Sequence, residues 1–83
     1  LSSATFSDCV FNDNEYEGIN GSYGSTIHLY GKATAIHSNG RGGIWATSSK
    51  VILHLPSHHN TSYNNTSEDR YTHLGGTITN VED

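Results

Sequence analysis

The sequence predicts an all-β fold, a parallel β-helix (a solenoid) of about three coils with an irregular C-terminal cap. Residues 14–19 and 39–44 share the pattern Asn-X-X-X-Gly-Ile. We call the step from Asn14 to Asn39 the repeat offset, and Phe11 and Ile36 are separated by the same step. Self-similarity at a fixed period of roughly 20–50 residues is the signature of stacked repeats.

Each coil has room for three short strands and three corners. We expect coils over approximately residues 2–25, 26–49 and 50–64, then a terminal loop and cap over 65–83, so that residues 1–83 form one β-helix fragment. Alternation of apolar residues after Lys50 predicts a register slip of one residue there. Residues 65–74 are expected to form a longer loop, because Glu68-Asp69-Arg70 stands where Gly-Ile is due. Strands in the plural are expected within residues 4–11, and single strands at 18–19, 26–30, 33–36, 44–47, 50–55 and 74–81.

Three asparagines at equal spacing predict an internal ladder. Asn14, Asn39 and Asn64 would stack at one corner, because equivalent residues of neighbouring coils lie about 4.8 Å apart. Buried amides need such partners, since an unmet one costs about 1–3 kcal/mol. The alternative is three turn-forming asparagines on the surface. Glycines crowd the same corner at 40, 42 and 43, which predicts backbone with positive φ.

Composition narrows the classes of fold and partner. Leucine occurs at only five positions, too few for a leucine-rich repeat, whereas a β-sandwich remains the rival fold. The net charge of −4, with four Lys and Arg in 83 residues, argues against a nucleic-acid surface. No apolar run approaches the roughly 20 residues of a membrane span. The single cysteine, Cys9, excludes an internal disulfide and is expected to be a small buried hydrophobe.

Asn-X-Ser/Thr sequons favour a secreted, extracellular or lumenal location. They begin at Asn20, Asn60, Asn64 and Asn65. Because Asn64 would point inward, the glycosylation candidates are Asn20, Asn60 and Asn65.

The corner pattern resembles that of a known superfamily. The units at 14–19 and 39–44 look like the repeats of right-handed parallel β-helix proteins of the pectin-lyase-like superfamily. The region from Val51 to Ile78 resembles the ends of secreted β-helix repeat proteins of algal type. The resemblance implies a right-handed helix and a C-terminal part of a longer protein. Many such proteins are polysaccharide lyases, hydrolases or epimerases, and many have no known activity.

The charged residues do not indicate a catalytic site in this segment. The resemblance implies that a lyase would combine clustered carboxylates with an Arg or Lys base. Glu17 and Arg41 are expected to be neighbours, because Tyr16 lies under Arg41 in coil register, and we interpret them as a surface salt bridge. We therefore expect no catalytic residue here. The remaining carboxylate candidates are Asp13, Glu15, Glu68 and Asp69.

Histidines raise the possibility of zinc. His54, His58 and His59 are closely spaced, with His28 and His73 as possible additions. No cysteine pair or carboxylate stands at a supporting interval, so we expect a polar corner, no metal site and no cofactor.

Aromatic residues suggest either local packing or contact with sugar rings. Trp45 precedes Arg70 by one repeat offset, which would place the guanidinium over the indole. Together with Tyr23 or Tyr30, Trp45 could instead present a platform to a polysaccharide.

A role in a larger assembly follows from the open end of so short a stack. Solenoids need at least about three repeats and caps. We expect additional coils, or another chain, to cover residues 2–11. The predicted function is a structural or binding segment of a secreted or cell-surface β-helix protein. The alternative is the C-terminal part of a carbohydrate-active enzyme whose catalytic residues lie on upstream coils.

Overall fold

A computed structural model describes residues 2–54 and 61–81 of the chain. These residues form strands only, which are joined by turns and bends. The strands are β1 (Ser3–Ser7), β2 (Val10–Asn12), β3 (Ile19–Ser22), β4 (Thr26–Tyr30), β5 (Ala35–His37), β6 (Ile44–Thr47), β7 (Lys50–His54), β8 (Ser62–Tyr63), β9 (Arg70–His73) and β10 (Thr77–Val81).

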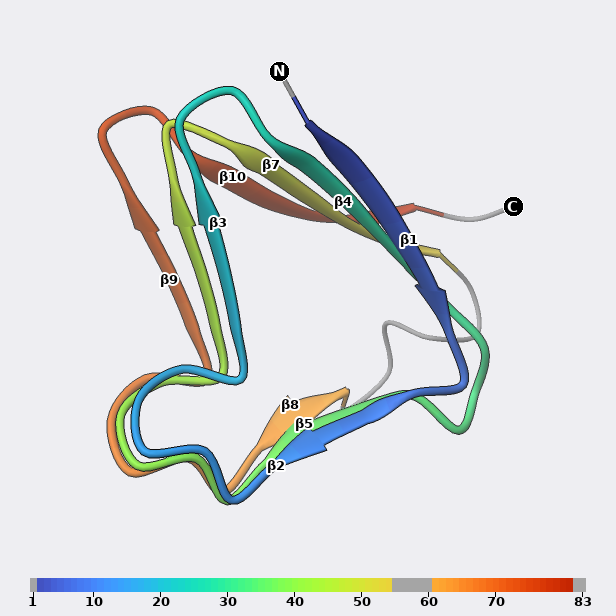
Figure 1. The fold of residues 1–83 in the computed structure, drawn as a ribbon, viewed down its shortest axis with the longest axis vertical. Helices are drawn as coiled ribbons and strands as arrows, with labels where there is room; N and C mark the ends of the chain where they lie inside the picture. The colour runs from blue at the N-terminus through green and yellow to red at the C-terminus, as the bar shows by residue number, and fades with distance from the viewer. Residues whose placement is uncertain (1, 55–60, 82–83) are drawn as a thin grey trace.

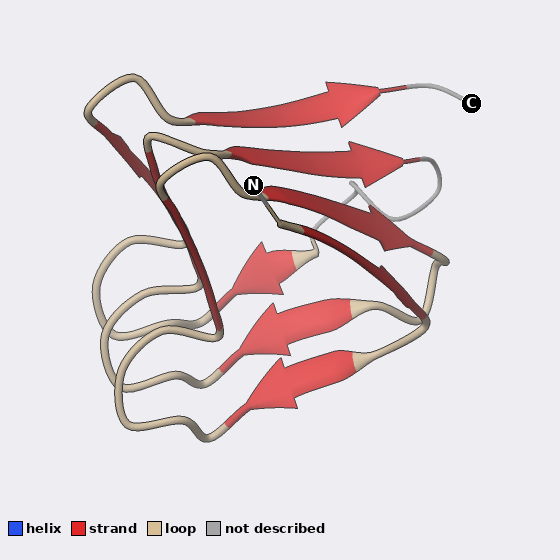
Figure 2. Cartoon of the chain, turned by 45° about the horizontal axis from the view of Figure 1, so that its top comes forward, coloured by secondary structure: helices blue, strands red, loops and turns tan. Residues whose placement is uncertain are grey.

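The strands form three parallel sheets, one on each side of a triangular coil (Figure 1). Sheet A has the order β1-β4-β7-β10, sheet B has β2-β5-β8, and sheet C has β3-β6-β9. Every third strand pairs with its equivalent in the next coil, as the stacked arrows of Figure 2 show. In Figure 1 the chain turns clockwise as it recedes from the viewer, so the helix is right-handed. The predicted parallel β-helix of about three coils is confirmed.

The interior is built from register-paired apolar residues, which we call interior columns. In sheet A, Phe6 pairs with Leu29 and Leu29 with Leu53. In sheet C, Ile19 pairs with Ile44, as the repeat offset predicts. Side chains alternate between the two faces of a strand, so every second residue of a strand points into the core. The fully buried core residues are Leu29, Ile36, Ile44, Ala46, Val51 and Leu53.

The period is not constant along the chain. Ile27 pairs with Val51 rather than with Ile52, which confirms the predicted one-residue slip. In sheet B, however, Ile36 pairs with Ser62, where the repeat offset expects Thr61. Every later position of the third coil is therefore displaced by one residue from the prediction.

The expected loop over residues 65–74 is wrong in part. Residues 70–73 form β9, which continues sheet C in register with β6. The third coil thus runs through β9, and β10 begins a further turn on sheet A. Charged residues at the Gly-Ile position concealed this strand.

The corner glycines are required for space, not for positive φ. Positive φ occurs at Gly24, Gly31 and Gly75, but not at the glycines of the asparagine corner. A Cβ at Gly43 would lie 2.6 Å from Asn65 Nδ2. The prediction of positive φ at Gly40, Gly42 and Gly43 is therefore wrong.

Candidate functional site

An asparagine ladder occupies the corner between sheets B and C. The backbone N and Nδ2 of Asn14 both donate to Asn39 Oδ1, at 3.2 and 2.9 Å. Asn39 repeats the pattern to Asn65 Oδ1, at 3.1 and 2.8 Å. Asn39 is 1% exposed, so these bonds satisfy the polar groups of an amide that water does not reach, whereas Asn14, at the open end of the stack, is exposed.

The third member of the ladder is Asn65, and the prediction of Asn64 is wrong. Asn64 is exposed and has a φ of 53°. Asp13 and Ser38 precede the other two ladder residues and have φ values of 58° and 57°. Each coil thus turns through one left-handed residue just before its ladder asparagine, a conformation that Asn and Asp tolerate well.

This exchange changes the glycosylation candidates. Asn65 Nδ2 donates to Asp69 Oδ1 at 2.9 Å and to Ser62 Oγ at 3.3 Å, so the nitrogen that would carry a glycan holds the ladder. Asn20 is exposed, and its Nδ2 donates to Glu17 Oε1 at 3.1 Å. Asn60 lies outside the described residues.

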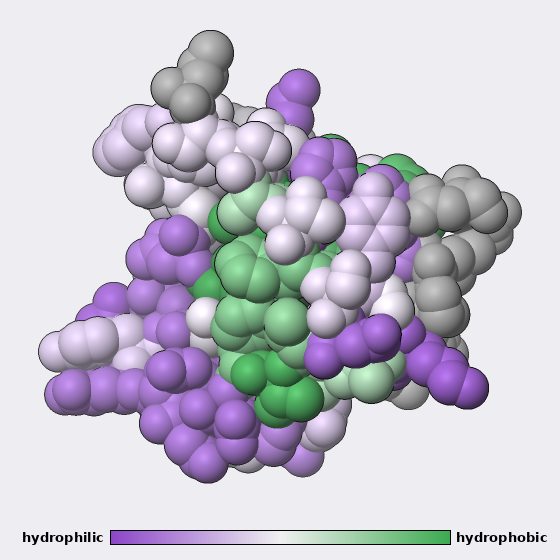
Figure 3. All heavy atoms as spheres, turned by 45° about the vertical axis from the view of Figure 1, so that its right-hand side comes forward, coloured by the Kyte–Doolittle hydropathy of each residue, from purple (hydrophilic) through white to green (hydrophobic). Residues whose placement is uncertain are grey.

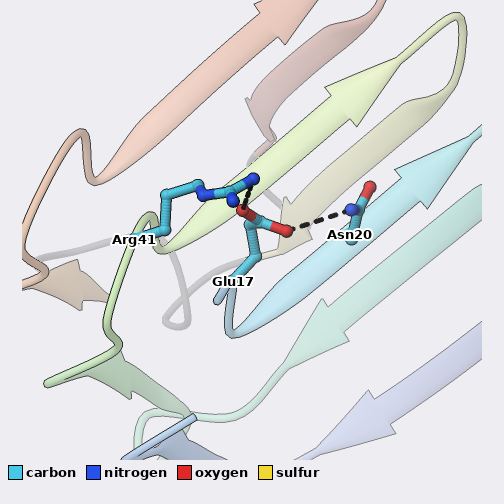
Figure 4. Close-up of polar contacts among 3 residues, drawn as sticks. All are labelled: Glu17, Asn20 and Arg41. Atoms are coloured by element: carbon cyan, nitrogen blue, oxygen red, sulfur yellow. Dashed lines mark hydrogen bonds and ion pairs between the residues drawn. The ribbon is translucent and has the colours of Figure 1, made fainter. Parts of the chain in front are cut away.

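A charged cluster lies next to the ladder on the outside of the coil. Arg41 Nη1 lies 3.4 Å from Glu17 Oε2, an ion pair without hydrogen-bond geometry (Figure 4). The pair is confirmed as neighbours, but only its cation is exposed: the side chain of Arg41 is 50% exposed and that of Glu17 only 7%. The carboxylate is therefore positioned by Arg41 and Asn20 and is shielded from solvent.

Aromatic residues extend this cluster over the outer face of sheet C. The Arg41 guanidinium lies 4.8 Å from the centroid of the Tyr16 ring and 5.6 Å from that of Trp45. Trp45 stacks on Tyr71 at 4.6 Å. The predicted Arg70–Trp45 stack is wrong, because Arg70 pairs with Ile44 and Tyr71 takes the position beside Trp45.

The other predicted sugar-contact residues lie apart from Trp45. Tyr30 belongs to sheet A and stacks on His54 at 4.0 Å. Tyr23 is 72% exposed and lies in the turn after β3. The structure therefore gathers Tyr16, Arg41 and Tyr71 around Trp45, a grouping that depends on the longer spacing of the third coil.

Two histidines of the expected polar corner contact each other on sheet A. His28 Nδ1 and His54 Nε2 are 2.9 Å apart. His58 and His59 lie outside the described residues. Over residues 2–54 and 61–81, no group of three or more His, Cys, Asp or Glu side chains is placed to hold a metal ion. Within the same ranges, no helix is long and apolar enough to cross a membrane.

Comparisons with protein-family models, with curated proteins and with solved structures give no match to this chain. The parallel β-solenoid architecture and the asparagine ladder thus stand on the geometry described above.

Proposed function

We propose that this chain is a structural or binding segment of a secreted or cell-surface β-helix protein, whose N-terminal end stacks on further coils or on another chain. The observation that supports the proposal is the open N-terminal end of the stack. Each of β1, β2 and β3 pairs on one side only, with β4, β5 and β6. Their other edges present backbone donors and acceptors that can pair with further strands.

The interior of this end is apolar and incompletely covered. Phe6 and Phe11 pack edge to face, with ring centroids 5.2 Å apart, yet both are only partly buried. On the outer face of β2, the neighbouring Val10 is 54% exposed. Figure 3 shows an apolar strip that crosses this side of the molecule between hydrophilic regions. Exposed apolar surface of this kind favours association.

The experiment is sedimentation velocity and thermal unfolding of the 83-residue chain. Without a covering coil, we expect either association through the N-terminal end or a broad thermal transition, because a short solenoid lacks cooperativity without its neighbours. Phe6→Glu should abolish any association, whereas Tyr23→Glu, on the exposed turn, should not. A monomer that unfolds in one sharp transition would contradict the proposal.

The corner signature supports a place in the pectin-lyase-like superfamily. The resemblance of residues 14–19 and 39–44 to its repeats rests on the Asn and Gly positions, whose packing roles are described above. Secretion is part of this proposal, since the exposed Asn20 and Asn64 both begin sequons.

Polysaccharide contact is the binding role that the outer face of sheet C supports. Trp45, Tyr71 and Arg41 gather there beside the Glu17 carboxylate. A glycan array tests this role: Trp45→Ala should remove the signal, and Tyr63→Ala, which removes a stacked ring from sheet B, should leave it. No signal from the wild-type chain would refute sugar contact.

The alternative function is that of the C-terminal coils of a carbohydrate-active enzyme. Its catalytic residues would lie on coils upstream of this segment. A groove of clustered carboxylates on such coils would favour the enzyme, and coils without one would favour the scaffold.

A further inference from the structure

The two ends of the coil stack differ in the chemistry of their interior columns. The columns of all three sheets begin with apolar residues or glycine at the N-terminal end and pass through the buried core. At the C-terminal end, the column that reaches Ile78 is the only one among the described strands that stays apolar. The others start at Phe6, Phe11, Ile19 and Gly21 and end at Asn80, Ser62, Arg70 and Thr72, respectively.

Asp69 ends the asparagine ladder by taking the place of the next asparagine. Asn65 donates its backbone N and its Nδ2 to Asp69 Oδ1, at 3.3 and 2.9 Å. Each Asn-to-Asn rung has the same pair of donors and the same kind of acceptor. An ionised carboxylate only accepts hydrogen bonds, so it has no donor to pass the ladder on.

Asp69 also fills the space that a further coil would need. Backbone pairing places it above Gly43, which itself lies above Gly18. A Cβ at Gly18 would lie 2.7 Å from Asn39 Nδ2, and one at Gly43 would lie 2.6 Å from Asn65 Nδ2. Glycine therefore occurs in the corner pattern because side chains of the next coil rest against it, the asparagine together with Ile36 at Gly18 and with Ser62 at Gly43. With its own Cβ, Asp69 excludes such an asparagine.

Arg70 adds a charge to an interior column. Tyr71 points outward, because it stacks on Trp45. Its neighbour Arg70 therefore belongs to the opposite face, in the column of Ile19 and Ile44. Partial burial already lowers the pKa of Arg70 through desolvation. A further coil would bury the guanidinium more deeply, and burying a charge is costly.

We propose that Asp69 and Arg70 terminate the stack at its C-terminal end, so that further coils dock only on β1, β2 and β3. The partner that fits the N-terminal end is a parallel β-coil with its own Asn-X-X-X-Gly-Ile corner. Its asparagine donates to Asn14 Oδ1, and its apolar strands cover Phe6 and Phe11. The docking half of this inference rests on the proposed function, whereas the terminating half does not.

The test attaches the same coil, residues 26–49, to either end of the chain. For the N-terminal extension, the copy stands directly before Ser3. For the C-terminal extension, it replaces the residues from Thr77 onward. Both junctions keep the register, because Thr26 pairs with Ser3 and with Lys50, and Lys50 pairs with Thr77. Melting temperatures are measured by circular dichroism.

The N-terminal extension should raise the melting temperature by several degrees, and the C-terminal extension should leave it unchanged or lower it. Asp69→Gly/Arg70→Ile restores the Asn-X-X-X-Gly-Ile pattern from Asn65, and it should make the C-terminal extension stabilising. The melting temperature of the unextended chain with the same double substitution shows how far the substitutions alone change its stability. Arg70→Ile alone keeps the Asp69 acceptor and so separates the effects of the two residues. With this single substitution, the C-terminal extension should stabilise the chain less than with the double substitution.

Two results would overturn separate parts of the account. A C-terminal extension that stabilises the chain without the substitutions, or fails to stabilise it with them, rules out the terminator and leaves the proposed function intact. An N-terminal extension that does not stabilise the chain refutes the docking end, and the proposed function with it.

Discussion

At the scale of single residues, the corner asparagines join one coil to the next. Each of these amides hydrogen-bonds to the neighbouring coil, so at this corner side chains join the coils as backbone hydrogen bonds do within the sheets. Asn39 also donates to the Phe11 carbonyl oxygen at 3.2 Å and thereby links the ladder to sheet B. The ladder is therefore a stabilising element and not a set of independent turns.

Asn39→Ala should destabilise the chain more than any substitution of an exposed asparagine. It leaves the N–H groups of Asn14 and the Phe11 carbonyl without their partners, at a cost of about 2–3 kcal/mol in free energy of unfolding. Asn12→Ala is the control, because the Asn12 side chain is exposed and donates to the exposed Asp13 beside it. That control should change stability by less than about 0.5 kcal/mol. Urea unfolding measures both, and equal losses would contradict the buried ladder.

Glycosylation offers a second residue-scale prediction. When the chain is secreted from a eukaryotic host, we expect glycans at the exposed Asn20 or Asn64, or at Asn60, which stays a candidate, and none at Asn65. A glycan on Asn65 would displace the amide donors to Asp69 and Ser62. Site-resolved mass spectrometry after enzymatic deglycosylation checks this, and an occupied Asn65 in the folded protein would refute the ladder register.

The sequence offered two adjacent candidates for the third rung, and the repeat offset selected the wrong one. Asn65 precedes Asp69 by the same interval as Asn39 precedes Gly43, and this interval is visible in the sequence. It was obscured because Asp-Arg replaces Gly-Ile and because the coil length varies. The pairing partner falls one residue short of the repeat offset between β4 and β7 in sheet A and one residue beyond it between β5 and β8 in sheet B.

At the scale of elements, short strands gain their stability from columns that run across the coils. The apolar residues of one column differ in burial. Leu29 is fully buried between neighbours, whereas Phe6 of the same column is half-buried at the open end. Strand periodicity predicted β4 and β7 well, because their apolar residues alternate. It could not predict β9, whose interior residues are the polar Arg70 and Thr72.

Position within a column should decide the cost of truncation. Leu29→Ala should cost about 2–5 kcal/mol in free energy of unfolding, because it leaves a cavity that its neighbours cannot fill. Phe6→Ala removes more atoms but should cost only roughly 1–2 kcal/mol, since its site already faces solvent. Equilibrium denaturation in urea compares the two. A larger loss at Phe6 would mean that the N-terminal end is already covered.

At the scale of the whole molecule, repetition made the architecture predictable. Two matching corners sufficed for the coil length and for the parallel stacking. The site was less predictable, because contacts such as Trp45 with Tyr71 depend on the third coil, where the spacing departs from the repeat offset. The difference between the two ends of the stack becomes visible only when each interior column is followed from the first coil to the last.

The most direct test of this account is a set of cross-strand nuclear Overhauser contacts in the full chain. The stacked coils predict contacts of the parallel type between Ile19 and Ile44 and between Ile44 and Arg70, together with side-chain amide contacts from Asn39 to Asn65. Antiparallel contacts, or an Asn39 amide paired with Asn64, would contradict the coil register on which the ladder depends.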